Sequence, residues 1–274
     1  MTRIKKIIEI IWTIWCLLSA TILILISFPV VIIHVLIFNE NKRKNLDMFV
    51  RIIAKTIMNL WGIKQKFIFE KKLDYNRSYL YVANHKSYLD AFIAILGIKQ
   101  YKNFIGKSEM FSWPIIGTLS KILGNVPVKR ESSSSRKKSY EWLVEILNKQ
   151  ISLFICPEGA VYMNDKLINE MRNGGFRAAI ESNTPIIVMS IINAGILFPS
   201  DKVRIRPGKC ITYMSEPIET SNLTINDIDN LREKVKNIIL NNLLKYYPNE
   251  KYPIEFNPQD YKEKVYLDTL KKEK

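Results

Sequence analysis

A histidine followed five positions later by an aspartate is the pair in this sequence best suited to proton transfer. His85 and Asp90 lie in the stretch 79–90, where an apolar run leads into Asn84 and His85. The chain has two histidines, and the other, His34, lies inside a long apolar segment. Histidine is the usual general base because its pKa lies near neutrality, and a carboxylate commonly holds its second ring nitrogen.

Local geometry limits how this pair can meet. In one continuous helix, residues five apart are rotated by about 140°, so the two side chains would diverge. They can meet if His85 lies in a loop after a strand and Asp90 lies in the first turn of the next helix. Residues 79–83 predict the strand, and Ser87 predicts the N-cap of the helix. In the alternative interpretation, Asp90 only complements the helix dipole and His85 is an ordinary loop residue.

The chain around this pair predicts an α/β fold, with a mixed central sheet flanked by helices. From residue 64 onward, short apolar runs alternate with longer amphipathic stretches, which is typical of strands alternating with helices. We predict strands at 66–69, 79–83, 103–105, 125–128, 152–156, 186–191, 203–205 and 211–214. We predict helices at 87–96, 139–148, 175–182 and 225–244.

Three further stretches hold candidate site residues, at 107–117, 124–130 and 156–159. In open α/β sheets, binding and catalytic residues lie at the carboxyl ends of the strands. His85, Arg130 and Glu158 would therefore share one edge of the sheet. Each has a simpler alternative when taken alone, because Arg130 also fits a solvated surface charge and Pro-Glu-Gly also fits an ordinary turn.

Composition favours an anionic partner and a reducing compartment. The chain of 274 residues is long enough for one large or two small domains, and its formal net charge is +15. That charge suits nucleic acid, a membrane surface or a phosphorylated substrate. The three cysteines, Cys16, Cys156 and Cys210, are scattered and fit neither a disulfide framework nor a zinc site. The simplest interpretation is a protein on the reducing, cytosolic side.

The N-terminal segment predicts a membrane anchor. Residues 10–38 contain no Asp, Glu, Lys or Arg, and as a helix they would reach roughly 43 Å, against about 30 Å for a hydrocarbon core. The run is too long and continuous for a signal peptide. A buried core helix is the alternative. Both flanks are basic, so a single span has no clear direction, whereas a hairpin bent at Ser27 and Pro29 keeps both flanks on the cytosolic side.

The next stretch, 44–61, has apolar residues at helical spacing with basic residues between them. It predicts either an amphipathic helix at the membrane surface or an ordinary helix packed on the catalytic domain. We therefore expect a membrane anchor and amphipathic helix at 1–61, a catalytic domain at 62–248, and a charged, loosely attached tail at 249–274.

Four motifs in order resemble those of the glycerolipid acyltransferase family, over residues 65–218. The segment 172–177 also resembles the family's Lys-x-Gly-x-Phe-Arg, and the hydrophobic N-terminus is similar to that of family members. The third motif departs from the family pattern, because Cys156, Ala160 and Val161 stand where the family has Phe, Thr and Arg. The matching residues are Asn84, His85 and Asp90 in the first motif, Gly124 and Arg130 in the second, Pro157, Glu158 and Gly159 in the third, and 184–188 in the fourth.

The resemblance implies direct acyl transfer at a membrane, with the catalytic domain on the cytoplasmic side. His85 would deprotonate the free hydroxyl of 1-acylglycerol-3-phosphate, and Asp90 would fix its tautomer. The donor would be acyl-CoA or acyl carrier protein, with no cofactor and no metal. Glu158 and Gly159 would bind the acceptor, and Arg130 and Lys107 its phosphate. Asn84, Gly124 and Arg172 complete the expected substrate-binding set.

The changed third motif leaves two alternatives. Arg172, Arg130 and Lys107 could compensate for the family's missing Arg; otherwise the chain would take a different lysophospholipid, or would be a catalytically silent homologue that binds anionic lipid. The intact His85 and Asp90 pair argues against the silent homologue. A nucleic-acid-binding protein is disfavoured, because the sequence has a membrane segment and no nucleic-acid motif.

Overall fold

The computed structural model describes residues 3–37, 42–128, 133–162 and 164–253. Within these residues, seven strands form one mixed sheet in the order β1-β7-β6-β2-β5-β3-β4. Neighbouring strands are parallel except β6 and β7, which run antiparallel. The strands are β1 (Ile63–Phe69), β2 (Leu80–Ala83), β3 (Lys102–Lys107), β4 (Val126–Val128), β5 (Ser152–Ile155), β6 (Ile186–Ile192) and β7 (Gly208–Met214).

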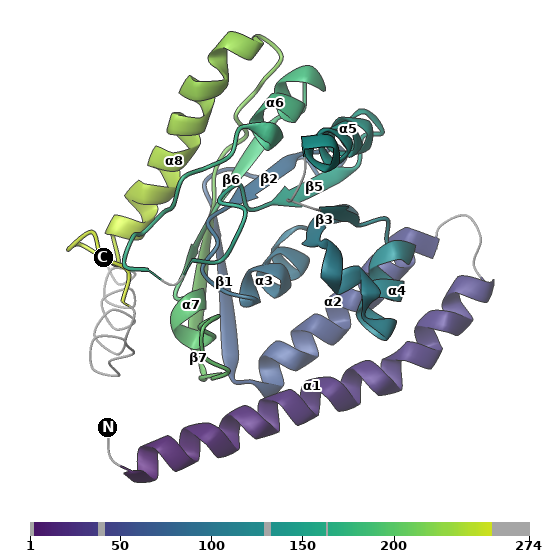
Figure 1. Ribbon diagram of the computed structural model, residues 1–274, viewed down its shortest axis with the longest axis vertical. Helices are drawn as coiled ribbons and strands as arrows, with labels where there is room; N and C mark the ends of the chain where they lie inside the picture. Colours follow the sequence, from purple (N-terminus) through teal and green to yellow (C-terminus); the bar gives the residue numbers. More distant parts are fainter. Residues whose placement is uncertain (1–2, 38–41, 129–132, 163, 254–274) are drawn as a thin grey trace.

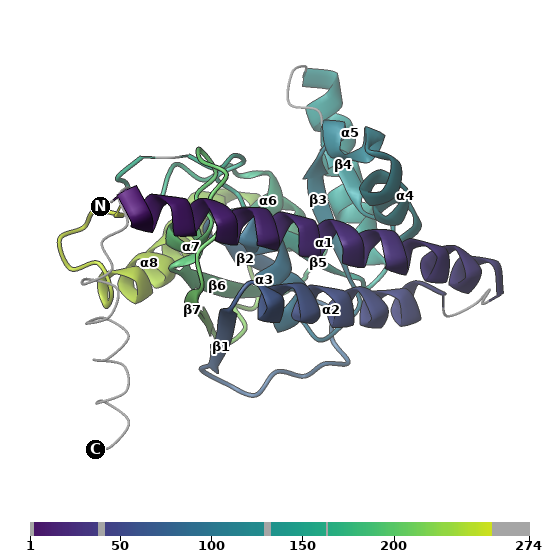
Figure 2. The same ribbon diagram turned by 90° about the horizontal axis from the view of Figure 1, so that it is seen from below.

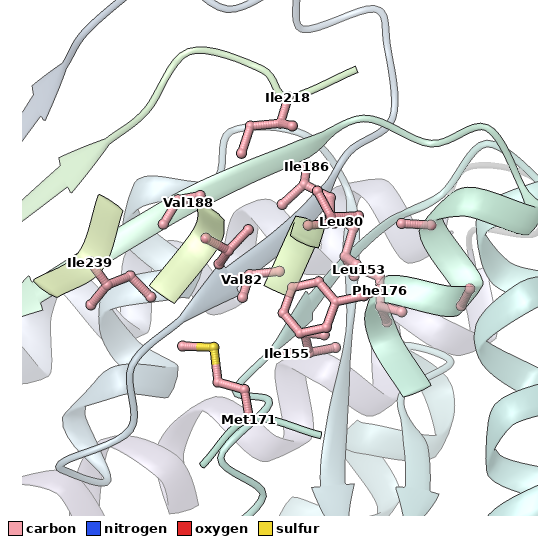
Figure 3. Close-up of a cluster of buried hydrophobic side chains, with 14 of the residues drawn as sticks. Leu80, Val82, Leu153, Ile155, Met171, Phe176, Ile186, Val188, Ile218 and Ile239 are labelled. Atoms are coloured by element: carbon pink, nitrogen blue, oxygen red, sulfur yellow. The ribbon is translucent and has the colours of Figure 1, made fainter. Parts of the chain in front are cut away.

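Helices cover both faces of this sheet (Figure 1). Strand side chains alternate between the faces, so Val82 joins one apolar cluster and Tyr81 the other. Figure 3 shows the first cluster, in which Phe176 and Ile239 pack on Leu80 and its neighbours. The covering helices are α5 (Ser133–Asn148), α6 (Gly174–Glu181) and α8 (Ile228–Leu244) on that face, and α2 (Lys42–Leu60), α3 (Leu89–Gly97) and α7 (Ala194–Leu197) on the other.

The central strands read as unbroken apolar runs because both of their faces are buried. Seven of the eight predicted strands are confirmed, with ends that differ by up to three residues. The prediction for 203–205 is wrong. There the chain makes a turn, and the backbone N–H of Ile205 donates to Thr13 of the N-terminal helix instead of to a strand. We also did not predict helix α4 (Pro114–Ile122), which begins at a proline in the first turn.

The N-terminal apolar segment is one continuous helix, α1 (Arg3–Ile37), which passes through Pro29 without turning back. Of the two arrangements that the sequence left open, the structure has the single helix and not the hairpin bent at Ser27 and Pro29. The hairpin that does form consists of α1 and α2, which lie side by side and antiparallel in Figures 1 and 2. The segment Lys6–Ile33 within α1 is long and apolar enough to cross a membrane.

One side of α1 is fixed to the rest of the protein by polar contacts. Glu9 accepts a hydrogen bond from Arg206 at 2.7 Å, and the backbone carbonyl of Cys16 accepts one from the Trp61 indole at 2.8 Å. The opposite side carries exposed apolar side chains, such as Ile11 and Ile26. The helix is thus docked lengthwise on the domain and presents a continuous apolar face outward.

Helix α2 confirms the predicted helix at 44–61 and packs on the domain with one face. Ile57 and Met58 are buried, while Met48 and Ile52 are exposed. Asp47, which is also buried, pairs with Lys102 of β3 at 2.7 Å and so ties this helix to the sheet. Met48 and Ile52 thus add exposed apolar side chains on the helix that lies beside α1.

Candidate active site

His85 and Asp90 meet at the carboxyl end of β2. The His85 Nδ1 and Asp90 Oδ2 atoms are 2.8 Å apart, His85 lies in the loop after β2, and Asp90 lies in the first turn of α3. This confirms the arrangement that the sequence predicted. The imidazole side chain is 25% exposed and the carboxylate 1%. The other ring nitrogen, Nε2, is therefore the one left to act on a substrate.

Asp90 is fixed more firmly than a dipole-complementing residue needs to be. The same Oδ2 atom also accepts hydrogen bonds from the backbone N–H groups of Lys86 and Ser87, both at 3.0 Å. The cap differs from our prediction, because the helix begins at Leu89 and Tyr88 takes the N-cap position. Ser87 Oγ still accepts from the Leu89 N–H at 3.0 Å. The loop thus closes around the carboxylate and holds it toward His85.

Glu158 reaches the same loop from the end of β5. Its Oε1 atom accepts a hydrogen bond from the His85 backbone N–H at 2.7 Å, and its Oε2 atom accepts two from Asn169, at 2.9 and 2.8 Å. The residue is 1% exposed. We expected Glu158 to bind the acceptor. In the structure, both carboxylate oxygens are instead occupied by the His85 backbone and by Asn169. Burial raises its pKa, against the hydrogen bonds from Asn169 and His85.

Two other expected substrate-binding residues have backbone roles in the structure. Asn84 is buried, and its side-chain amide both donates to and accepts from the Ile191 backbone, at 2.9 and 2.8 Å. It therefore fixes the end of β2 against β6. Gly124 has a φ of +76° after the end of α4, a conformation that suits glycine. Its carbonyl accepts from the Asn103 side chain, which joins this turn to β3.

Two of the candidate phosphate-binding residues, Lys107 and Arg172, lie within the described residues, and their surroundings differ. Lys107 ends β3, is 62% exposed at its side chain, and pairs with Glu109 at 3.1 Å. The Arg172 side chain lies over Gly159, where an added Cβ would come within 2.9 Å of the Arg172 Nε. Gly159 has a φ of +79°, so a side chain there would be strained as well as crowded. Arg130 lies outside the described residues.

Cys156 is a site residue whose role the sequence did not indicate. It follows β5, packs on the same apolar cluster as α3, and lies near enough to His85 for the two side chains to shift each other's pKa. Burial raises the pKa of this thiol, while His85 lowers it in part. Burial alone would lower the pKa of His85, but its contacts with Cys156 and Asp90 outweigh burial and raise that pKa above 6.5. The signal was available, since Cys156 departs from the family's Phe.

Lys86 was also missed. It is 2% exposed and lies directly after His85, whereas a lysine in a loop is usually read as a surface residue. The described residues include no group of three or more His, Cys, Asp or Glu side chains placed to hold a metal ion.

The site can nevertheless do proton-transfer chemistry. A partly exposed imidazole on a buried carboxylate can remove a proton from a hydroxyl group.

The comparisons with known proteins agree with this geometry. A model of the acyltransferase family matches residues 64–192. A chloroplastic 1-acyl-sn-glycerol-3-phosphate acyltransferase of Brassica napus is 30% identical over 121 residues, which cover 44% of this chain and 35% of that protein. A lyso-ornithine lipid O-acyltransferase of Pseudomonas aeruginosa is 35% identical over 88 residues, covering 32% and 33%. The chain thus spans about a third of the length of each relative.

A solved structure shares the fold across most of the chain. The 1-acyl-sn-glycerophosphate (LPA) acyltransferase PlsC from Thermotoga maritima matches with a TM-score of 0.73 and 20% sequence identity. The match covers 85% of this chain and 94% of that one, so it includes much more than the segment matched by the family model. The two chains therefore have the same mixed α/β architecture.

Proposed function

We propose that this chain, whose residues 64–192 match a model of the acyltransferase family, moves a fatty acyl group from acyl-CoA or acyl carrier protein to the free hydroxyl of 1-acylglycerol-3-phosphate. The observation that carries this proposal is the contact of His85 with the buried Asp90 at 2.8 Å, at the carboxyl edge of the sheet. The product is phosphatidic acid, and the donor leaves as a free thiol.

Proton transfer by His85 links the two substrates. His85 Nε2 removes the hydroxyl proton, and the oxygen attacks the thioester carbonyl carbon. The carbon–sulfur bond then breaks, and the leaving sulfur takes the proton back from the imidazolium. Asp90 holds the tautomer in which Nδ1 carries hydrogen, and it stabilises the imidazolium. No residue of the chain needs to be acylated in this sequence.

The sheet order supports a phosphate site beside the histidine. The parallel strands β2, β5, β3 and β4 end at one edge, so that the ends of β3 and β4 lie to one side of His85. Lys107, at the end of β3, supplies a cation there, and Arg130 follows β4 in the sequence. Arg172, over Gly159, supplies another. Charge-assisted hydrogen bonds to phosphate are the strong kind.

A second acceptor class is favoured by one departure from the family pattern. Val161 stands where the family has an arginine, so this chain offers one cation fewer next to Glu158 and Gly159. A relative named for a lyso-ornithine lipid acceptor is 35% identical to part of the chain. Our second candidate is therefore acylation of a lysolipid that lacks a terminal phosphate.

The N-terminal helices support a site at a membrane surface. Helix α1 is docked on the domain by Glu9 and Thr13 and carries an outward apolar face, and Met48 and Ile52 of the neighbouring α2 are also exposed. Embedding that face would bring the domain to the lipid surface that holds its substrate. We place the domain on the cytoplasmic side, where acyl thioesters are made. The full chain should resist salt extraction, and its release by salt alone would refute an embedded helix.

Acyl transfer measured with a panel of acceptors tests this proposal. The full chain, in vesicles, receives labelled acyl-CoA or acyl carrier protein together with 1-acylglycerol-3-phosphate, lyso-ornithine lipid or monoacylglycerol. We expect the phosphorylated acceptor to give the highest kcat/KM, and His85→Ala to abolish the product. A preference for lyso-ornithine lipid would select the second candidate. No transfer to any acceptor, with wild type and His85→Ala indistinguishable, would overturn both.

A further inference from the structure

Lys86 is a buried cation with a complete set of partners. Its Nζ atom lies 3.2 Å from Asn164 Oδ1 and 3.5 Å from the Tyr162 backbone carbonyl oxygen. The third partner is the face of the Tyr252 ring, whose centroid is 5.3 Å away. An ammonium group has three donors, and an unpaired buried charge is costly, so each of these partners matters. Burial lowers the pKa of Lys86, while Glu158, Asp165 and Asp90 oppose that change.

Tyr252 comes from the segment after α8, which we expected to be loosely attached. The residue is 4% exposed, its N–H donates to the Asp165 carbonyl at 2.7 Å, and Lys251 forms a β-bridge with Lys166. Gly195 leaves the space for this contact, because a Cβ there would come within 2.6 Å of the Lys86 carbonyl oxygen and 2.7 Å of the Tyr252 hydroxyl. The beginning of the tail is thus part of the domain.

A continuous series of contacts leads from this tyrosine to the backbone of the histidine. Asn164, which accepts from Lys86, donates to Asn169 Oδ1 at 2.8 Å. Asn169 donates twice to Glu158 Oε2, and Glu158 Oε1 accepts from the His85 N–H at 2.7 Å. The backbone of Lys86 also donates to Asp90. Displacing Lys86 would therefore disturb both supports of the imidazole.

We propose that Tyr252 and Lys86 are positioning residues for the reaction. The tyrosine ring holds the buried ammonium, and the ammonium holds the loop that carries Asn164 and Asn169. This loop in turn fixes Glu158 against the His85 backbone. The activity readout of this inference rests on the proposed acyltransferase function. A displacement of about 1 Å at a reacting group costs on the order of a hundred-fold in rate. Loss of the ring should therefore lower kcat while the KM values of both substrates stay close to wild type.

The proposal is tested by substitutions that distinguish the loss of the aromatic ring from the loss of packing alone. Tyr252→Leu keeps an apolar side chain and removes the aromatic face, and we expect a ten- to hundred-fold lower kcat. Tyr252→Phe keeps the ring, and because the tyrosine hydroxyl has no hydrogen-bond partner within the described part of the chain, it should recover most of that kcat. Lys86→Met keeps the aliphatic part of the side chain and removes the charge. Its kcat should fall as in Tyr252→Leu, and it replaces Tyr252→Leu as the test if that variant fails to fold.

The chain offers a matched control. Lys245, the exposed residue after α8, has its Nζ atom 4.9 Å from the ring centroid of Tyr213 in β7, which is a lysine–tyrosine contact that takes no part in the site. Tyr213→Leu should lower the unfolding temperature while leaving kcat within about two-fold of wild type. An equal fall in kcat for Tyr213→Leu and Tyr252→Leu would show that both act through stability, and would overturn the proposal.

A direct readout on the histidine separates this inference from the proposed function. His85 is one of two histidines, so NMR titration of the full chain in detergent, with His34→Gln as the reference, reports its pKa. In Tyr252→Leu the contact with Asp90 should loosen, and the pKa of His85 should fall toward 6.5. An unchanged titration together with an unchanged kcat would overturn the proposal. Failure of acyl transfer in wild type would instead count against the proposed function.

Discussion

We call the part of the candidate site around His85, Asp90 and Glu158 the histidine side, and the part around Lys107 the cationic side. The two sides are built in different ways. On the first, Asp90 and Glu158 are 1% exposed, and each accepts three hydrogen bonds. On the second, Lys107 is 62% exposed, and its ion pair with Glu109 lies at the surface. Surface ion pairs hold side chains weakly and are screened by salt. The first side is preorganised for chemistry, whereas the second can adjust to a headgroup.

The largest effect should come from removing the base. His85→Ala should abolish acyl transfer, a loss of at least about a thousand-fold, because general base catalysis alone supplies on the order of 10²–10⁴. Folding should persist, since the side chain is partly exposed and Asp90 keeps its two backbone donors. Turnover and thermal unfolding of the purified chain measure the two effects. Near-normal turnover would mean that the first side is not the catalytic one.

Alkylation of Cys156 should block the same side without any mutation. Cys16 and Cys210 are buried, whereas Cys156 is partly exposed beside His85. Iodoacetamide should therefore inactivate the wild type, and Cys156→Ala should resist it. Because burial raises the pKa of the thiol, inactivation should be slow at neutral pH and faster as the pH rises. Equal rates of inactivation in wild type and Cys156→Ala would place the reactive thiol elsewhere.

Changing the carboxylate should have a smaller effect than removing the base. Asp90→Asn should lower kcat by orders of magnitude, but by less than His85→Ala does, because the amide favours the wrong imidazole tautomer. Asp90 raises the pKa of His85, so the acidic limb of kcat/KM in the variant should move to lower pH, toward 6.5. Asp47→Asn is the control, because it also changes a buried acid but one that pairs with Lys102 and Arg51. Its pH profile should match wild type, even if its stability falls.

The cationic side should respond in acceptor affinity. Arg130→Ala should raise the acceptor KM and lower acceptor kcat/KM by roughly ten- to hundred-fold, the equivalent of one charge-assisted contact of about 1.5–3 kcal/mol. The donor KM should stay nearly constant, and discrimination against a dephosphorylated acceptor should disappear. Arg130→Lys should recover part of the loss, since a point charge lacks the planar fork. Equal losses of kcat/KM with the phosphorylated and the dephosphorylated acceptor would show that Arg130 does not bind the phosphate. Lys107 and Arg172 would then be the candidates.

The histidine side was predictable from the sequence where its contacts are local. His85 and Asp90 are five residues apart, so one loop and one helix start determine their meeting. The shared strand edge predicted that Glu158 lies nearby, but not that its carboxylate faces the His85 backbone from below. That direction depends on Asn169 and the loop after β5, which have no periodic pattern.

Long-range contacts account for most of what we missed. Lys86 and Tyr252 lie far apart in the chain, and each residue type is common at surfaces, so nothing in the sequence pairs them. The stretch 203–205 has the composition of a strand, yet its backbone contacts the N-terminal helix. Helix α4 also went unpredicted: Pro114 begins it, and Gly117 lets the helix approach Phe111.

The contact between Tyr252 and Lys86 joins distant parts of the chain and so bears on how the protein is made. The ribosome delivers the chain from its N-terminus, so α1 emerges long before Tyr252 completes the surroundings of Lys86. Likewise, the Asn84 side chain can fix the end of β2 only after Ile191, 107 residues later, has been synthesised. The apolar helix is thus free to reach a bilayer while the histidine site is still incomplete. A nascent chain would therefore expose its apolar helix first and complete the surroundings of His85 only after Tyr252 has been synthesised.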